Sequence, residues 1–175
     1  MKLKPKETAA RLSLLARQAA VFSAKNQGFP EPRFLKNEEN APIPENGVYW
    51  AISHKPTCVA GVVATSPVGI DIEKVKPMGR KMFEQIASDT EWALFGERAE
   101  ISFFRMWTAK EAVLKSIGIG YRGIENCYVR EVVDSHRLTM AYENDVWQVS
   151  HFYMDDHIVA MSTKESMDIC WKIYF

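Results

Sequence analysis

The sequence predicts an α+β fold, because its strand patterns cluster late in the chain and do not alternate regularly with helical patterns. Several short runs of alternating apolar and polar residues follow Asn126, whereas the longest helical pattern ends before them at Ile117. A chain of 175 residues forms one globular unit or two small lobes packed together.

The first helix and the first strands are marked by apolar spacing and by the breakers between them. Residues 8–25 carry apolar side chains at helical spacing, and Gly28 lies just beyond this predicted helix. Prolines crowd residues 29–46, which predicts an extended loop. Two strands follow at 48–54 and 57–65, and the short connection between them predicts a hairpin.

The middle of the chain contains a further strand and three helical patterns. Ser66-Pro67 separates the hairpin from a predicted strand at 68–73. After a loop, short helices are predicted at 81–87 and at 88–95, and the second opens on a Ser-x-x-Glu capping box. The main helix is predicted at 98–117, with glycines closing it.

The last third of the chain predicts antiparallel strands, because its apolar residues alternate with polar ones in short runs. The runs are 128–133, 138–142, 146–153, 157–162 and 169–174.

The composition gives no sign of a nucleic-acid or membrane partner. Lys plus Arg and Asp plus Glu are equal at 22 each, so no basic excess marks a polyanion-binding surface. No apolar run approaches the roughly 20 residues of a membrane span, and no signal-peptide core follows the charged first residues. Three cysteines without C-x-x-C spacing are typical of reduced core residues. We expect a cytoplasmic location and favour a monomer.

Three acids and a lysine form the candidate site. Asp71 and Glu73 lie two residues apart in the predicted strand at 68–73, so both carboxylates project from the same face. Glu111 and Lys115 lie four residues apart in the main helix and share a helix face. Carboxylate oxygens suit Mg²⁺, which commonly shares its coordination shell with substrate phosphates. The pattern therefore indicates phosphoryl chemistry.

Each of these residues also has a purely structural interpretation. Thr108-x-x-Glu111 fits a capping box in which the glutamate satisfies a backbone N–H, and Glu111 with Lys115 fits a surface ion pair. The two strand acids fit the solvated face of an edge strand. His54, at the end of its strand, fits a solvated polar group. The joint occurrence of these residues is far more specific than any one of them.

Three motifs follow one another along the chain: Ser53-His54 on a strand, Gly-Ile-Asp-Ile-Glu at 69–73, and Trp-Thr-Ala-Lys-Glu-Ala-Val-Leu-Lys at 107–115. In this order they resemble the 4′-phosphopantetheinyl transferases of the surfactin-synthetase-activating type. The resemblance covers residues 8 to about 162. It implies two pseudo-symmetric lobes, each a small antiparallel sheet packed on a helix, with the active site between them. Residues 1–67 would form a reduced N-terminal lobe, and 68–175 a C-terminal lobe carrying the metal site.

Three departures from the family pattern concern the coenzyme, one of which is Lys55 after His54, where a serine is common. Family members usually carry about forty more residues before the first helix, in keeping with ordinary domain sizes, so we expect a shortened front segment. Many members also read Gly-Lys-Pro before the Ser-His strand, whereas this chain aligns Asn40-Ala41-Pro42 and lacks a lysine that would meet a coenzyme A phosphate. Lys55 offers a partial substitute.

The resemblance implies transfer of the 4′-phosphopantetheine arm of coenzyme A to a serine of an apo acyl or peptidyl carrier protein. Adenosine 3′,5′-bisphosphate would be released. Asp71, Glu73 and Glu111 would bind Mg²⁺, with Mn²⁺ as an alternative. Glu111 would act as the general base, directly or through a metal-bound water, and Lys115 would contact the phosphate oxygens. The Ser-His pair would bind a coenzyme phosphate.

Two other functions fit the same residues. A different Mg²⁺-dependent phosphotransferase or phosphatase would use the same acids without a carrier protein. A catalytically impaired homologue would serve as a binding module for coenzyme A or a carrier protein. Ala41 and the shortened front segment favour that module, and the intact acids oppose it.

Overall fold

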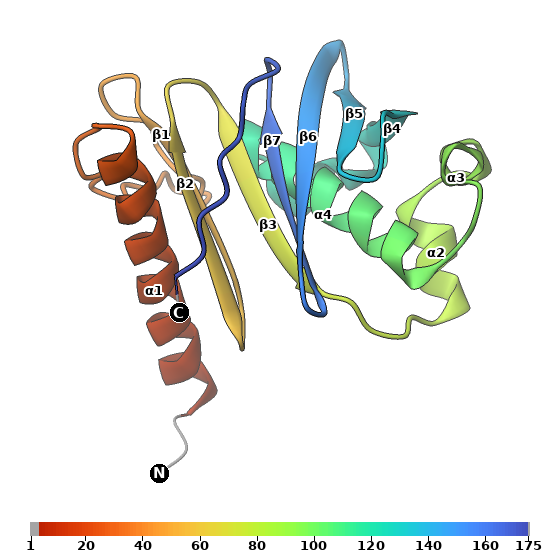
Figure 1. The fold of residues 1–175 in the computed structure, drawn as a ribbon, viewed down its shortest axis with the longest axis horizontal. Coiled ribbons are helices and arrows are strands. Elements are labelled where there is room, and N and C mark those ends of the chain that lie inside the picture. Colours follow the sequence, from red (N-terminus) through yellow and green to blue (C-terminus); the bar gives the residue numbers. More distant parts are fainter. Residues whose placement is uncertain (1–3, 175) are drawn as a thin grey trace.

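The computed structural model describes residues 4–174 and contains two antiparallel sheets, each packed against a helix (Figure 1). The smaller sheet pairs β1 (Tyr49–Lys55) with β2 (Cys58–Ala64), and the larger has the strand order β3-β7-β6-β5-β4. The strands of the larger sheet are β3 (Val68–Lys74), β4 (Cys127–Val132), β5 (Arg137–Tyr142), β6 (Asp145–Met154) and β7 (His157–Thr163). The predicted α+β class is confirmed.

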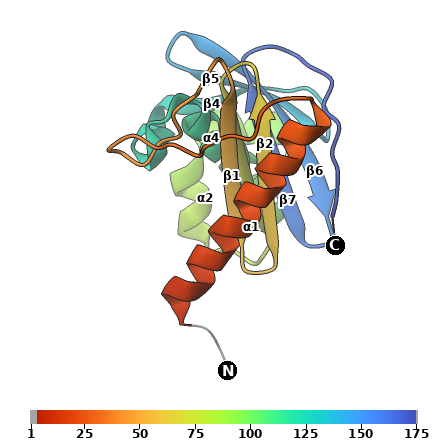
Figure 2. The same cartoon turned by 90° about the vertical axis from the view of Figure 1, so that its left-hand side faces the viewer.

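Helix α1 (Pro5–Asn26) covers the β1–β2 hairpin, and small residues let the two approach closely (Figure 2). Ala16, Ala20 and Ala24 are buried along one stripe of the helix. A Cβ added at Gly61 of β2 would lie 2.4 Å from the Ala20 backbone nitrogen and 2.5 Å from the Ala16 carbonyl oxygen. Glycine is therefore required at this crossing. The predicted first helix and the hairpin are confirmed.

Helix α4 (Glu100–Ile117) packs on the larger sheet, and its contact with β3 positions the candidate site. Side chains such as Phe103 and Val113 are buried between the helix and the sheet. A Cβ added at Gly69 of β3 would lie 1.9 Å from the Ala112 carbonyl oxygen. The missing side chain brings β3 against α4, so residues on the two elements can meet.

Three short helices complete the structure: α2 (Arg80–Ile86), α3 (Asp89–Phe95) and the 3₁₀ helix η1 (Gly120–Asn126), the last of which the sequence did not predict. The predicted capping box at the start of α3 is present. The Ser88 hydroxyl accepts from the Glu91 backbone N–H at 3.3 Å, and a Glu91 carboxylate oxygen accepts from the Ser88 N–H at 3.0 Å.

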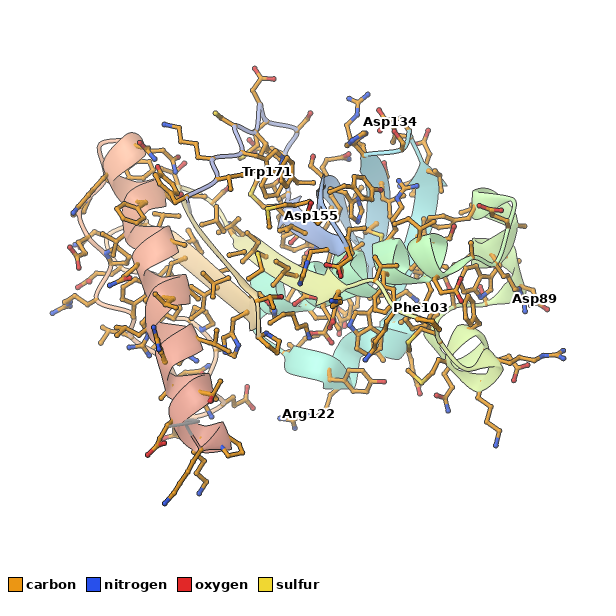
Figure 3. All side chains as sticks on the ribbon, turned by 60° about the horizontal axis from the view of Figure 1, so that its bottom comes forward. Asp89, Phe103, Arg122, Asp134, Asp155 and Trp171 are labelled. Atoms are coloured by element: carbon orange, nitrogen blue, oxygen red, sulfur yellow. The ribbon has the colours of Figure 1, made fainter. Side chains whose placement is uncertain are left out.

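The strand predicted at 169–174 is wrong. This segment forms no strand and crosses the face of the sheet opposite α4, running from the end of β7 toward α1 (Figures 1 and 3). Trp171 stacks on Phe152 with ring centroids 5.5 Å apart. Ile169 and Trp171 are half-buried, and the residue between them is exposed. The alternation of apolar and polar residues in this segment arises because one of its sides packs on the sheet, and not because the segment pairs as a strand.

None of the helices within residues 4–174 is both long enough and apolar enough to cross a membrane. The chain passes from the smaller sheet to the larger one between Ala64 and Val68. The division into lobes at 1–67 and 68–175 stays a prediction, and residues 1–3 and 175 of those spans lie outside the described residues.

Candidate active site

A cavity of about 390 Å³ lies where β1, β3 and α4 meet, and every site residue singled out from the sequence lines it. Those residues are Ser53, His54, Asp71, Glu73, Glu111 and Lys115. Further lining comes from Ser13, Lys36, Ile52, Lys55 and Trp107. Residues far apart in the sequence therefore form one site.

Asp71 is the most buried acid of the cavity, with 5% of its surface exposed. Its Oδ1 atom accepts from the Ser53 hydroxyl at 2.9 Å and from Lys115 Nζ at 2.7 Å. Lys115 Nζ also donates to the Ile70 carbonyl oxygen at 3.1 Å. These bonds join β1, β3 and α4 around one carboxylate. The solvated-edge interpretation is therefore excluded for Asp71.

Glu73 is held by a second lysine and by a tryptophan. Its Oε1 atom lies 2.7 Å from Lys55 Nζ and accepts from Trp107 Nε1 at 3.2 Å. Lys55 is thus engaged inside the protein. Its predicted use as a substitute for a phosphate-binding lysine would require it to leave Glu73.

Glu111 is half-buried in the cavity wall, and within residues 4–174 its carboxylate has no hydrogen bond or ion pair. Burial raises the pKa of Glu111, and the nearby charges of Asp71 and Glu73 raise it further, while Lys115 and Lys55 act in the opposite direction. Three carboxylates facing one cavity thus repel one another.

The structural alternatives for Glu111 are excluded. Thr108 lies in the interior of α4 and donates its hydroxyl hydrogen to the Phe104 carbonyl oxygen at 2.7 Å, so it caps no helix. Lys115 pairs with Asp71 across the cavity instead of with Glu111 along the helix.

His54 faces the cavity from the end of β1 and is half-buried. Burial lowers the pKa of His54, and the positive charges of Lys115 and Lys55 lower it further. The imidazole is therefore neutral at pH 7, with one N–H available to donate to an anionic ligand.

Four lining residues were not predicted from the sequence: Ser13, Lys36, Ile52 and Trp107. Ser13 lies three residues before the buried Ala16 on α1, so the two share a helix face. The helical spacing could therefore have predicted that Ser13 faces the sheet. Trp107 begins the helix motif, yet an aromatic residue in a helix is more often a core residue. Lys36 lies in the loop before β1, and no feature of a single sequence places it at the cavity.

The donor set of the cavity fits a hard divalent cation, although the ligands are not assembled around a common point. Asp71 Oδ2 is buried without a hydrogen-bond partner among the described residues, and oxygen atoms of this kind suit Mg²⁺. Across residues 4–174, no three His, Cys, Asp or Glu side chains are arranged to hold a metal ion. Lys55 and Lys115 instead occupy one oxygen each of Glu73 and Asp71.

Residues 67–162, more than half of the chain, match the family model of the 4′-phosphopantetheinyl transferase superfamily. The chain belongs to this superfamily. The matched span includes the three acids and Lys115 of the cavity, whereas Ser53 and His54 precede it.

Curated 4′-phosphopantetheinyl transferases resemble the chain over part of their length. The chain is 35% identical over 91 residues to the transferase gsp of Aneurinibacillus migulanus, a match covering 50% of this chain and 38% of that protein. It is 38% identical over 110 residues to psf-1 of Bacillus pumilus, covering 61% and 43%. It is 33% identical over 94 residues to Sfp of Bacillus subtilis strain 168, covering 50% and 42%. The chain thus spans about two fifths of these relatives.

Proposed function

We propose that the protein transfers the 4′-phosphopantetheine arm of coenzyme A to a serine of an apo acyl or peptidyl carrier protein. The observation that carries this proposal is the convergence of Asp71, Glu111 and Lys115 on one cavity, inside the span that matches the transferase superfamily. The names of the curated relatives support the same reaction.

The residues of the cavity have separate tasks in this reaction. The carrier serine oxygen forms a bond to the β-phosphorus of coenzyme A, and the bond from that phosphorus to the bridging oxygen breaks, which releases adenosine 3′,5′-bisphosphate. Glu111, whose pKa is raised and whose carboxylate has no partner among the described residues, accepts the serine proton. Lys115 contributes a positive charge beside the phosphate oxygens, and His54 donates a hydrogen bond to a coenzyme phosphate.

We assign Asp71, Glu73 and Glu111 as the residues that would hold Mg²⁺ or Mn²⁺. A bound divalent ion supplies charge stabilisation for the pyrophosphate and for the leaving phosphate. Asp71 Oδ2 and the Glu111 carboxylate are free to act as ligands, whereas Glu73 shares its Oε1 with Lys55.

The test is direct. Purified protein is incubated with coenzyme A, Mg²⁺ and a panel of apo carrier proteins, and the intact mass of each carrier is measured. A gain of one phosphopantetheine unit that is lost with a chelator supports the proposal and identifies the carrier class. No gain with any carrier, in protein that is folded and metal-loaded, contradicts it.

A binding module for coenzyme A or a carrier protein is the second candidate function. The lysine contacts to Asp71 and Glu73 favour it, because they occupy oxygens that a catalytic metal would use. Calorimetry and the mass assay together separate the two candidates. A binding module binds coenzyme A equally well with and without Mg²⁺ in calorimetry, and it leaves the mass of every carrier unchanged. A cytoplasmic location and a monomeric state stay predictions.

A carrier protein would approach the end of α4, where exposed side chains project from the surface. Tyr121 is 59% exposed, and Arg122 extends outward beyond the helix (Figure 3). An exposed aromatic residue beside a basic one suits a partner with apolar and acidic groups on its surface. This placement of the carrier is part of the proposal.

A further inference from the structure

The turn between β1 and β2 carries His54 and Lys55 to the cavity. It consists of Pro56 and Thr57 alone, because Lys55 pairs with Cys58. Two-residue hairpin turns favour the primed types, which need positive φ at the first central residue. Neither of these two described residues has positive φ, and proline fixes its φ near −65°. The backbone twist of this turn therefore does little to fix the end of the hairpin.

A relay of side chains ties this turn to the larger sheet. Thr57 Oγ1 lies 3.0 Å from His157 Nε2, and His157 Nδ1 lies 2.8 Å from Asp156 Oδ1. The other oxygen of Asp156 lies 2.6 Å from Lys74 Nζ. His157 is buried at the start of β7, with 7% of its surface exposed. We call these four residues the Thr57 relay, which links the β1–β2 turn to the ends of β7 and β3.

Both nitrogens of the His157 ring are engaged in the relay. Asp156 accepts the hydrogen on Nδ1, so Nε2 accepts from the Thr57 hydroxyl when the ring is neutral. A hydroxyl can donate or accept, so the bond between Thr57 and His157 does not depend on the protonation of the ring. The backbone at Asp156 is also fixed, because its carbonyl oxygen accepts from the Val75 N–H at 2.7 Å.

A second tie joins the same turn to β3 from inside the cavity. Lys55 Nζ lies 2.7 Å from Glu73 Oε1. The proposed function assigns Glu73 to a divalent cation, and a bound cation competes with Lys55 for that carboxylate. The Thr57 relay uses none of the proposed metal ligands. It therefore persists when the cavity is occupied and the Lys55 tie is weakened.

We propose that Thr57 and His157 are positioning residues that hold His54 at the cavity once Lys55 releases Glu73, and that they thereby set the affinity for coenzyme A. This inference rests on the proposed function, since it takes a coenzyme phosphate as the ligand of His54. None of the four relay residues is among those that line the cavity. Loss of the relay therefore weakens coenzyme binding and leaves the transfer step unchanged.

The first experiment measures backbone amide hydrogen exchange at residues 54–59 in ligand-free protein. Thr57→Val removes the hydroxyl at nearly constant volume, whereas Thr57→Ser keeps it. Each is made alone and with Lys55→Met, which removes the second tie. The control is Thr65→Val, at the exposed opposite end of the same hairpin.

With Lys55→Met present, Thr57→Val should speed exchange about threefold to tenfold, the ratio expected for one net hydrogen bond. Thr57→Ser and Thr65→Val should each exchange at the rate of the protein into which they are introduced, with or without Lys55→Met.

The second experiment measures the coenzyme A dissociation constant by calorimetry in the presence of Mg²⁺, together with turnover at saturating coenzyme A. Thr57→Val should raise the dissociation constant about threefold to tenfold, and Thr57→Ser should restore it. The turnover of Thr57→Val at saturation should equal that of the wild type.

Three results would overturn the inference. Exchange at 54–59 that is unchanged by Thr57→Val in both backgrounds would show that the relay does not hold the turn. Faster exchange with an unchanged dissociation constant would show a structural tie without effect on the ligand. Wild-type protein that binds no coenzyme A, yet shows relay-dependent exchange, would overturn the proposed function and the ligand assigned to His54, while leaving the relay as a purely structural tie.

Discussion

At the scale of single residues, Glu111 has a carboxylate without a partner among residues 4–174 and surroundings that oppose its ionisation. Burial and the charges of Asp71 and Glu73 raise its pKa, so the folded protein holds the Glu111 proton more tightly than the unfolded chain does. The stability linked to this group is therefore present at low pH and is lost as the pH rises through the raised pKa. Above this raised pKa, the ionised carboxylate destabilises the folded protein, and it is the form that the proposed reaction needs.

Glu111→Gln should separate the catalytic role of this carboxylate from its effect on stability. The amide cannot accept the serine proton, so transfer should fall by roughly 10²- to 10⁴-fold, the usual contribution of a general base. In metal-free protein at pH 7, the melting temperature should equal or exceed that of the wild type, because a charge is removed. Intact-mass kinetics and a thermal scan with chelator measure the two effects. Glu97→Gln, an exposed neutralisation between α3 and α4, is the control. Near-normal transfer in Glu111→Gln would contradict the role given to this residue.

Lys55 should compete with a metal ion for Glu73. Replacing it by Met frees Glu73 Oε1 and removes a positive charge from the cavity, so Mg²⁺ affinity should rise roughly fivefold, the factor for a surface ion pair worth about 1 kcal/mol. The increase of melting temperature with Mg²⁺ concentration measures this affinity. Lys81→Met, an exposed lysine of α2, should leave the Mg²⁺ response unchanged. An unchanged response in Lys55→Met would mean that Glu73 is not a ligand.

At the scale of elements, the site depends on the close approach of β3 and α4. Gly69 permits this approach, because a Cβ at that position would lie 1.9 Å from the Ala112 carbonyl oxygen and 2.7 Å from Ser116 Oγ. A backbone oxygen cannot rotate away, so the strand would have to move from the helix. That movement would separate Asp71 from Lys115, which now lie 2.7 Å apart.

Gly69→Ala should therefore impair both stability and activity. Overpacking of this severity costs about 3 kcal/mol, which lowers the melting temperature of a protein of this size by roughly 6–12 °C. Transfer should fall even at temperatures where the variant is folded. Gly79→Ala is the matched control, since a Cβ there meets no atom within 4 Å and its φ is not positive. A Gly69→Ala protein with wild-type melting temperature would show that β3 and α4 can separate freely.

The sequence predicts where helices and strands occur better than it predicts what each of them pairs with or packs against. The helix at 98–117 and the strand at 68–73 have strong periodicity, and both occur within two residues of their predicted ends. The run at 169–174 has the same period as a strand, yet it covers the sheet without pairing. Alternation reports that one side of a segment is buried, and it does not report what buries it. The helix η1 lies among glycines and polar residues, where no apolar period exists.

The same limit applies to the candidate site. The two-residue spacing of Asp71 and Glu73 places both side chains on one face of the strand, and the four-residue spacing of Glu111 and Lys115 places both on one face of the helix. The acidic residues of the cavity were therefore predictable. The pairing of Lys115 with Asp71 and of Lys55 with Glu73 depends on how two strands and a helix pack, which no local pattern encodes. Lys36 enters the cavity through the path of a loop, and it was not predictable for the same reason.

At the scale of the whole molecule, the two sheets share no strand pairing within residues 4–174, so side chains hold them together. Ala51 of β1 and Ile70 of β3 belong to one buried cluster, which Trp171 of the C-terminal segment covers. The Ser53 hydroxyl adds a polar tie between the sheets, because it accepts from the Ile72 N–H at 3.3 Å and donates to Asp71. The cavity lies at this junction, so its geometry depends on the stability of the whole chain.

His151 makes that stability dependent on pH. It lies on β6 among the buried residues under α4, with 2% of its surface exposed and its Nδ1 atom unpartnered among the described residues. Burial lowers the pKa of His151 to about 3 from 6.5, and the charge of Arg105 acts in the same direction. The unfolded chain binds a proton at this histidine near pH 6.5, whereas the folded protein does not bind it until about pH 3. The stability from this group is therefore complete above pH 6.5 and is lost as the pH falls toward 3.

His151→Leu should remove this dependence. Between pH 6 and 4, the free energy of unfolding of the wild type should fall more steeply than that of the variant, by up to about 1.4 kcal/mol per pH unit, the slope for one proton. Denaturant unfolding at several pH values measures both slopes. Val149→Ala, on the same face of β6, should lower stability equally at every pH, because it creates a cavity without removing a titrating group. Equal slopes for the wild type and His151→Leu would mean that the folded protein accepts the proton at His151, and that this part of the core opens to water in acid.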